Sequence, residues 1–208
     1  MATGTEESGN NVTPPPIPRQ SGGLRRRVAV ILVTVGVTCG LLLAALRGFG
    51  LVRPFRTPTG AMTPAIAAGD HTMMEGLSFL LGDPQRGDVV VFKTGPALAN
   101  PPGTLFVKRI AGLPGEKVQI KEGRLVINGN PVVLENKAGT INYTIMPAAR
   151  FLPDEETTIT VPSGEYFVLG DASTNSYDSR FWGLVPRSDI LGRMTFCYWP
   201  PRNVGAVK

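Results

Sequence analysis

A long uncharged apolar segment constrains this chain more than any other feature. Val28 to Leu46 is a run of 19 residues without an acidic or basic side chain, and only Thr34 and Thr38 add hydroxyl groups to it. At about 1.5 Å per residue, a helix of this length spans roughly 28 Å, close to the roughly 30 Å hydrocarbon core of a bilayer. The run is longer than the roughly 7–15-residue core of a cleavable signal peptide. We therefore interpret segment 24–52 as a permanent transmembrane anchor.

Arginine residues border the apolar segment on both sides. Six of them carry more positive charge than the whole formal net charge of +5. The excess positive charge of the chain therefore lies at the ends of the apolar run and does not indicate a nucleic-acid-binding face. Arg25, Arg26 and Arg27 directly precede the run, whereas the arginines after it are scattered. The positive-inside rule then predicts a cytoplasmic N-terminus and an external domain over residues 53–208.

The segments on either side of the anchor differ in composition. Residues 1–23 are rich in Gly, Pro, Ser, Thr and Asn, a composition that predicts a disordered cytoplasmic tail. About 150 residues follow the anchor, enough to bury the core of one domain.

Short apolar runs interrupted by Gly and Pro predict that the external domain is mostly β. Asn128-Gly129 is a strong hairpin signal, and residues 117–165 are predicted to include a small β insertion. The predicted strands cover residues 88–92, 105–110, 118–120, 124–127, 131–133, 166–169 and 194–199.

Histidine and cysteine residues are too few to indicate a metal site or a Ser-His-Asp triad. His71 is the only histidine, and we interpret it as a surface or loop residue. Cys39 lies in the apolar run and Cys197 lies near the C-terminus, so an internal disulfide is not expected. No metal or cofactor is implied.

Three motifs beyond the anchor indicate chemistry. The first reads Pro-Thr-Gly-Ala-Met-Thr-Pro (58–64), the second Lys-Arg-Ile-Ala-Gly-Leu-Pro-Gly-Glu (108–116), and the third runs from Gly170-Asp171 to Trp-Gly-Leu-Val-Pro at 182–186. Prolines and a glycine in the first motif predict a tight, extended backbone that holds a side chain towards a cleft. In this order behind one anchor, the motifs resemble the signature boxes of the bacterial type I signal peptidases, or leader peptidases.

The resemblance implies a serine protease that uses a lysine as its general base. Such a lysine must lose roughly three units of pKa to be neutral near pH 7, and burial in an apolar pocket has this effect. The implied roles are a general base (Lys108), a nucleophile position (Ala61), an oxyanion-hole hydroxyl (Thr59), a residue that orients the lysine (Ser176), a structural ion pair (Asp178 and Arg180) and two supporting residues (Met62 and Asp171).

Three positions depart from the family pattern. Ala61 stands where the family has its nucleophilic serine, Ala172 replaces the usual Asn, and Ser173 occupies a position that is often Arg. We expect the last two to reduce the polar support around the site. A methyl group cannot attack a carbonyl, so three interpretations stay open. The chain is an engineered Ser-to-Ala variant, or a naturally inactive member that binds signal peptides, or a protease whose nucleophile is Thr59.

The resemblance implies a membrane-bound endopeptidase that removes signal peptides from secreted preproteins. Such an enzyme requires small residues at positions −1 and −3 relative to the cleaved bond. Its expected partners are signal peptides, the lipid bilayer and the secretion machinery, and no nucleic acid. The alternative is a signal-peptide-binding pseudoprotease without turnover. A soluble, self-cleaving Ser-Lys repressor is disfavoured because the chain has an anchor and no DNA-binding region.

Overall fold

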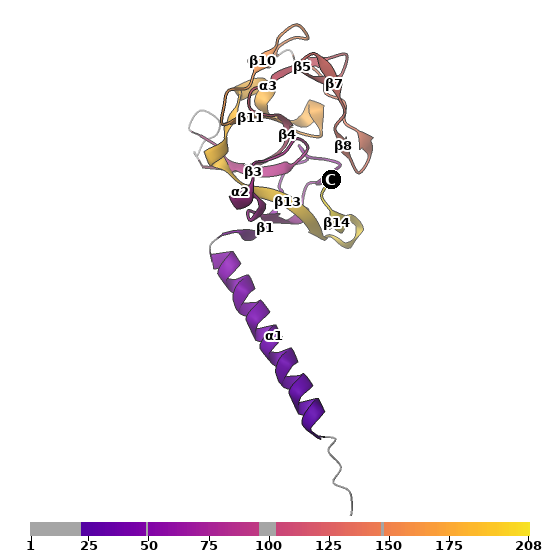
Figure 1. Cartoon of the computed structure of the whole chain (residues 1–208). Coiled ribbons are helices and arrows are strands. Elements are labelled where there is room, and N and C mark those ends of the chain that lie inside the picture. Colours follow the sequence, from indigo (N-terminus) through magenta and orange to yellow (C-terminus); the bar gives the residue numbers. More distant parts are fainter. Residues whose placement is uncertain (1–21, 49, 96–102, 147) are drawn as a thin grey trace, which may run out of the picture. The chain divides into compact units, whose positions relative to one another are not determined.

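The computed structural model describes residues 22–48, 50–95, 103–146 and 148–208. The chain divides into two units, Met1–Ala44 and Ala45–Lys208, and each is described by itself (Figure 1). The predicted tail lies outside the described residues except for Gly22 and Gly23, which begin helix α1.

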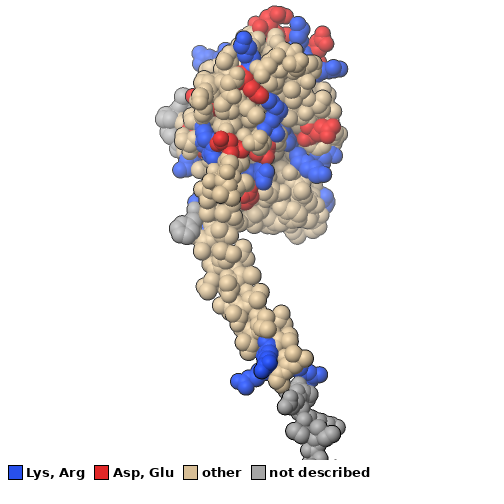
Figure 2. Space-filling model, in the orientation of Figure 1, with Lys and Arg blue, Asp and Glu red and all other residues tan. Residues whose placement is uncertain are grey.

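Helix α1 (Gly22–Gly48) contains the long apolar run. Its 27 residues correspond to a length of about 40 Å. None of its described side chains is buried in protein, and Figure 2 shows that the middle of the helix carries no charged group. By length and composition this one helix qualifies as a membrane span. The helix ends at Gly48 and the chain is extended from Val52, whereas the anchor was predicted over 24–52.

The second unit is mostly β, as the sequence predicts. Its main sheet has eight antiparallel strands in the order β1-β2-β13-β3-β4-β11-β12, with β14 paired to β13. The inner strands β3 and β11 are nearly continuous apolar runs because both of their faces are covered. The strands are β1 (Val52–Arg56), β2 (His71–Glu75), β3 (Val89–Lys93), β4 (Leu105–Gly112), β11 (Glu165–Leu169), β12 (Val185–Pro186), β13 (Ile190–Trp199) and β14 (Gly205–Ala206).

Two smaller sheets lie within residues 117–165. One has the order β10-β5-β6-β7, and the other pairs β8 with β9. The turns at Glu122-Gly123 and Asn128-Gly129 have positive φ at both residues, the backbone that two-residue hairpins with matching twist require. The strands are β5 (Lys117–Lys121), β6 (Arg124–Ile127), β7 (Asn130–Val132), β8 (Glu135–Asn136), β9 (Gly139–Thr140) and β10 (Ile159–Thr160).

A hydrophobic core joins the four-stranded sheet to the main sheet. Val118 and Leu125 from the smaller sheet pack in one cluster with Phe167 and Leu169 of β11. The approach is so close that a Cβ at Gly112 would lie 2.4 Å from Val118 Cγ2. The short helices, which all lie in connections, are α2 (Ser78–Leu81), η1 (Ser173–Asn175), α3 (Ser179–Trp182), η2 (Arg187–Asp189) and η3 (Pro201–Asn203).

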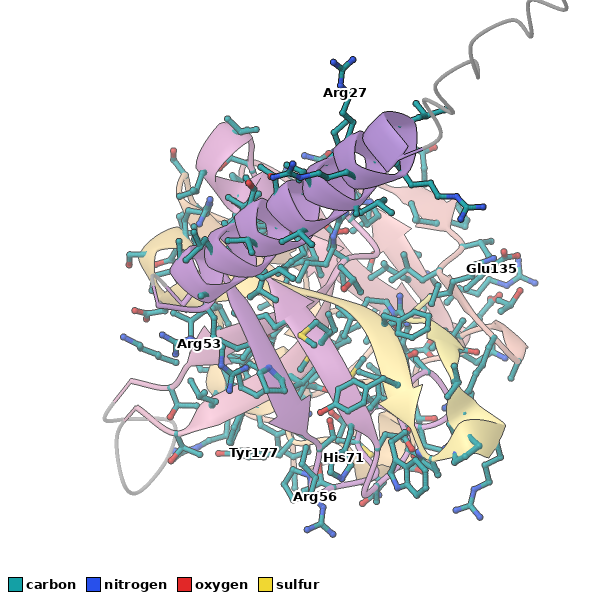
Figure 3. The ribbon with its side chains drawn as sticks, turned by 90° about the horizontal axis from the view of Figure 1, so that it is seen from below. Arg27, Arg53, Arg56, His71, Glu135 and Tyr177 are labelled. Atoms are coloured by element: carbon teal, nitrogen blue, oxygen red, sulfur yellow. The ribbon has the colours of Figure 1, made fainter. Side chains whose placement is uncertain are left out.

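The single histidine, interpreted as a surface or loop residue, lies on a strand and not in a loop. His71 is half-buried at the start of β2, where Arg56 of β1 is its cross-strand neighbour (Figure 3). Its ring meets Tyr198 edge-on at 5.8 Å between centroids. The preceding carboxylate, Asp70, accepts hydrogen bonds from Ala67 N and Asn203 Nδ2.

Candidate active site

The first motif lies in the loop between β1 and β2. The loop is closed at its base, where Thr57 N donates to Asp70 O at 3.0 Å and Gly69 N donates to Thr57 O at 2.7 Å. Thr63 N donates to Gly60 O at 3.0 Å, so the backbone turns here. The prediction of an extended backbone through this motif is therefore wrong, because the chain turns between Gly60 and Thr63.

The first and third motifs contact each other through their backbones. Ala172 N donates to Ala61 O at 3.0 Å. A Cβ at Gly170 would lie 2.1 Å from Ser176 Oγ and 2.7 Å from Ala61 O. Because only a residue without a side chain fits there, Gly170 allows Ser176 and Ala61 to approach closely.

The side chain of Lys108, in the second motif, points towards the contact between the first and third motifs. It lies on β4 opposite Val90 of β3, and its Nζ donates a hydrogen bond to Ser176 Oγ at 2.9 Å. The residue is only 4% exposed. The structure thus brings together a lysine and a serine that are 68 residues apart in the sequence.

Burial changes the acid–base behaviour of this amine. Desolvation lowers the pKa of Lys108 from its ordinary value to about 8, while the nearby Asp178 carboxylate raises the pKa and the Arg180 guanidinium lowers it again. With a pKa of about 8, roughly a tenth of the amines are neutral at pH 7. Lys108 therefore has the protonation behaviour of a general base at mildly alkaline pH.

An ion pair lies directly behind this dyad. Arg180 donates to Asp178 through Nε and Nη2, both at 2.8 Å, and neither side chain is accessible to solvent. Asp178 Oδ2 also accepts from Gly170 N at 3.0 Å. The carboxylate therefore holds both the arginine and the glycine against which Ser176 packs.

Ser173 strengthens this network, so the expectation that it reduces the polar support is wrong. Its buried hydroxyl accepts from Arg180 Nη1 at 2.9 Å and from Thr144 N at 2.7 Å, and its carbonyl accepts from Arg180 Nη2 at 2.7 Å. A small hydroxyl fits where a long cationic side chain would meet Arg180.

A second buried ion pair joins the second and third motifs. Arg109 donates to Asp171 through Nε and Nη2, both at 2.7 Å. Arg109 follows Lys108 on β4, so the two side chains point to opposite faces of the strand. Sequence reasoning assigned no role to Arg109, although an arginine inside an apolar strand requires a buried carboxylate partner.

A cleft of about 440 Å³ connects the dyad to solvent. Thr59 is an exposed residue on its wall, whereas the Thr57 hydroxyl is buried without a hydrogen-bond partner. Sequence reasoning also missed Thr57, Asn175 and Tyr177, because no local pattern reveals that they line one cleft. The cleft is lined by Thr57, Pro58, Thr59, Ala61, Met62, Thr104, Leu105, Phe106, Val107, Lys108, Asn175 and Tyr177.

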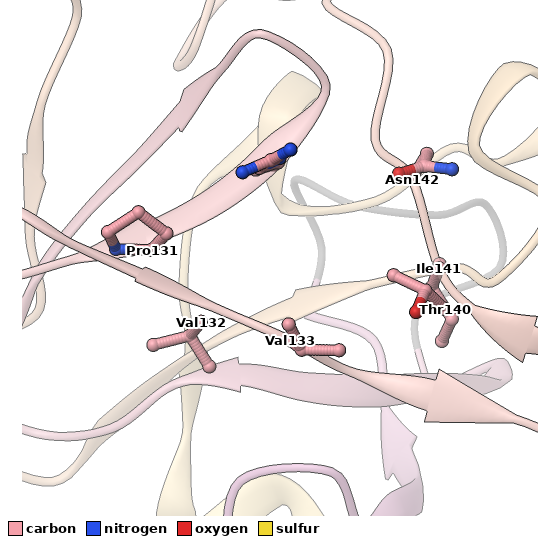
Figure 4. Close-up of a pocket in the computed structure, with 7 residues that line it drawn as sticks. Pro131, Val132, Val133, Thr140, Ile141 and Asn142 are labelled. Atoms are coloured by element: carbon pink, nitrogen blue, oxygen red, sulfur yellow. The ribbon is translucent and has the colours of Figure 1, made fainter.

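Another hollow, of about 390 Å³, lies on the smaller sheet (Figure 4). Its wall is formed mainly by Pro131, Val132, Val133 and Ile141, with Arg124 as its single ionisable side chain. No acid–base pair is found among its lining residues, in contrast to the cleft at Lys108.

A buried lysine beside a hydroxyl, under a cleft on a β domain, is typical of peptidases that use an amine as their base. The family model for signal peptidases, peptidase S26, matches residues 26–199. The chain therefore belongs to the signal peptidase I family of peptidase S26, a family of serine-type endopeptidases that process signal peptides.

Bacterial relatives cover most of the chain. A probable signal peptidase I-2 from Synechocystis sp. is 38% identical over 170 residues, which cover 81% of this chain and 72% of the relative. A signal peptidase I from Leptolyngbya laminosa is 40% identical over 151 residues, covering 71% and 69% of the two chains. A crystal structure of a signal peptidase I from Enterococcus faecalis V583 has a TM-score of 0.42 and 32% identity, and the match covers 55% of this chain and 98% of that one.

Proposed function

We propose that this chain is a membrane-bound endopeptidase that removes signal peptides from secreted preproteins, with Lys108 as its general base. The observation that carries the proposal is the buried Lys108 amine, which contacts Ser176 and lines the same cleft as Thr59 and Ala61. An extended substrate strand with small side chains fits a shallow cleft with apolar walls of this kind.

We assign the nucleophile to the hydroxyl of Thr59, which lines the same cleft as Lys108 and stands two residues before Ala61, whose methyl group has no lone pair. Neutral Lys108 takes the hydroxyl proton as Thr59 Oγ1 bonds to the scissile carbonyl carbon. The carbon–nitrogen bond then breaks, and the lysine ammonium returns its proton to the leaving amine. Water, deprotonated by Lys108, next attacks the Thr59 ester, and the proton passes to the threonine oxygen as the signal peptide leaves.

The remaining site residues position this pair. Ser176 accepts the Lys108 hydrogen bond and directs the amine towards the cleft. Asp178 and Arg180 support the backbone at Gly170. Met62 lines the cleft and packs into the core beneath it, and Asp171 acts more remotely through its pair with Arg109.

Helix α1 serves as a single-pass anchor in the bacterial plasma membrane, with the N-terminus in the cytoplasm and the β domain outside. The supports are the uncharged length of the helix, its lack of buried side chains and the arginine cluster that precedes the apolar run. A substrate whose own apolar segment is in the bilayer then meets the enzyme in two dimensions, close to the secretion machinery.

The test is cleavage of a preprotein with an Ala-x-Ala site by the full chain in proteoliposomes. We expect Thr59→Ala and Lys108→Met to abolish product formation, whereas Thr63→Ala, which removes an exposed hydroxyl from the same loop, should have little effect. Unchanged cleavage by Thr59→Ala would exclude Thr59 as the nucleophile.

The second candidate function is capture of signal peptides without turnover, and the methyl group at position 61 favours it. In that case the wild-type chain binds the preprotein and releases no product, while Ala61→Ser, which restores a hydroxyl beside Ser176, gains cleavage. A wild-type chain that cleaves, and that loses cleavage with Thr59→Ala, excludes this alternative.

A further inference from the structure

The hydroxyl of Thr59 cannot perform two tasks at once. The family resemblance assigns this hydroxyl to the oxyanion hole, whereas the proposed function uses it as the nucleophile. When Thr59 Oγ1 bonds to the scissile carbonyl carbon, its proton passes to Lys108, and the threonine oxygen then has no proton to donate. The negative charge that develops on the carbonyl oxygen therefore requires hydrogen-bond donors other than this hydroxyl.

Asn175 places a side-chain amide beside the loop that carries Thr59. The two residues line the same cleft, and both are exposed. A Cβ at Gly60 would lie 3.5 Å from Asn175 Nδ2, so the amide nitrogen approaches the chain between Thr59 and Ala61. The Asn175 side chain forms no hydrogen bond with another residue in the described part of the chain. Its N–H donors are therefore free to bind a substrate oxygen.

Hydrogen bonds fix the backbone around Asn175. Asn175 N donates to Ala172 O at 2.8 Å, and Ala172 N donates to Ala61 O at 3.0 Å. The next residue, Ser176, accepts the hydrogen bond from Lys108 Nζ at 2.9 Å. The amide therefore projects from a segment that is tied to both the nucleophile loop and the base. A donor on such a support needs little reorganisation when charge develops in a transition state.

We propose that Asn175 is a further catalytic residue, whose side-chain amide donates a hydrogen bond to the scissile carbonyl oxygen as that oxygen becomes negative. The inference rests on the proposed function, because it takes Thr59 as the nucleophile.

The amide acts only while the tetrahedral intermediate exists. As Thr59 Oγ1 bonds to the carbonyl carbon, the π electron pair of the carbonyl moves onto its oxygen, and Asn175 Nδ2 donates to that oxygen. The pair returns to the carbonyl when the carbon–nitrogen bond breaks, and the leaving amine takes the proton held by Lys108. The amide itself neither gains nor loses a proton.

The experiment measures kcat and KM for preprotein cleavage by the full chain in proteoliposomes. We expect Asn175→Ala to lower kcat by about 10²–10³-fold, the usual effect of removing one oxyanion donor, with KM little changed. Asn175→Asp keeps the shape of the side chain and replaces the donor by a negative charge, so it should lower kcat at least as much. The matched control is Thr174→Ala, which removes an exposed hydroxyl from the same short helix η1 and should keep the wild-type kinetics.

The pH profile distinguishes a catalytic donor from a structural role. The Asn175 amide does not titrate, so Asn175→Ala should keep the midpoint of the kcat/KM profile at its wild-type pH. A variant that only displaced Ser176 would change the surroundings of the Lys108 amine and shift this midpoint, and that result overturns the proposal. A raised KM with unchanged kcat would assign Asn175 to substrate binding and also overturns it.

Comparison with Ala61→Ser separates this inference from the proposed function. If the wild-type chain cleaves and loses cleavage with Thr59→Ala, an unchanged kcat in Asn175→Ala overturns the inference and leaves the proposed function in place. A wild-type chain that does not cleave, while Ala61→Ser does, refutes the proposed function and the inference with it.

Discussion

Replacing Lys108 by methionine tests the central physical claim that burial lowers the pKa of this amine. The pKa of about 8 lies below the ordinary value of roughly 10.4, and this difference corresponds to about 3 kcal/mol of destabilisation while the amine is charged. Methionine keeps the length of the side chain and removes the charge. Loss of the hydrogen bond to Ser176 offsets about 1 kcal/mol of this stabilisation. Lys108→Met should therefore raise the free energy of unfolding at pH 7 by about 2 kcal/mol.

The effect of Lys108→Met on Tm should depend on pH. The unfolded chain keeps the Lys108 proton to a higher pH than the folded chain, so the penalty is complete below about pH 8 and disappears as pH rises towards roughly 10.4. For a domain of this size, 1 kcal/mol shifts Tm by roughly 2–4 °C. Lys108→Met should then raise Tm by roughly 4–8 °C at pH 7 and lower it slightly at pH 10.5.

The assay is thermal unfolding of the full chain in detergent, with each variant compared with the wild type at the same pH. Lys93→Met, which removes an exposed lysine on β3, is the control and should leave Tm nearly unchanged at both pH values. A Tm difference for Lys108→Met that stays constant between pH 7 and pH 10.5 would refute burial as the source of the lowered pKa.

Three further predictions follow from the site. The kcat/KM for preprotein cleavage should rise with pH through about 8 and then level off, because only the neutral Lys108 amine accepts a proton; a flat pH–rate profile contradicts this. Asp178→Asn should cost about 3–5 kcal/mol of folding stability, because it leaves Arg180 buried without its charged partner. The control, Asp83→Asn, breaks an exposed pair with Arg187 and should cost less than about 1 kcal/mol. Equal losses of Tm in the two variants would contradict the role of burial. Gly170→Ala should abolish cleavage because its methyl group overlaps Ser176. Gly82→Ala, whose Cβ meets only Ser78 O within 4 Å, at an ordinary contact distance of 3.9 Å, should remain active in the same assay.

Local sequence patterns predicted much of this fold for physical reasons. The length of the apolar run matches a bilayer, and hairpin turns such as Asn128-Gly129 depend on φ values that only a few residue types favour. The resemblance to the signal peptidase family, and not a local pattern, predicted that Lys108, Ser176, Asp178 and Arg180 lie in one site. The prediction of an extended backbone at Ala61 failed, because a local hydrogen bond between Thr63 N and Gly60 O closes a turn there. The strand at His71 was missed, because it depends on pairing with β1 and with the distant strand β13.

The sequence alone determined the membrane-length helix, the β class of the domain and the residue types available for chemistry, since these follow from composition and short-range spacing. Only the tertiary structure decided which groups meet. The pKa of Lys108 is lowered because β3, β4 and the loop after β11 exclude water from its amine. Ser173 supports Arg180 because the chain folds back to Thr144. Desolvation and ion pairing depend on neighbours in space, and these neighbours are assembled from segments that lie tens of residues apart along the chain.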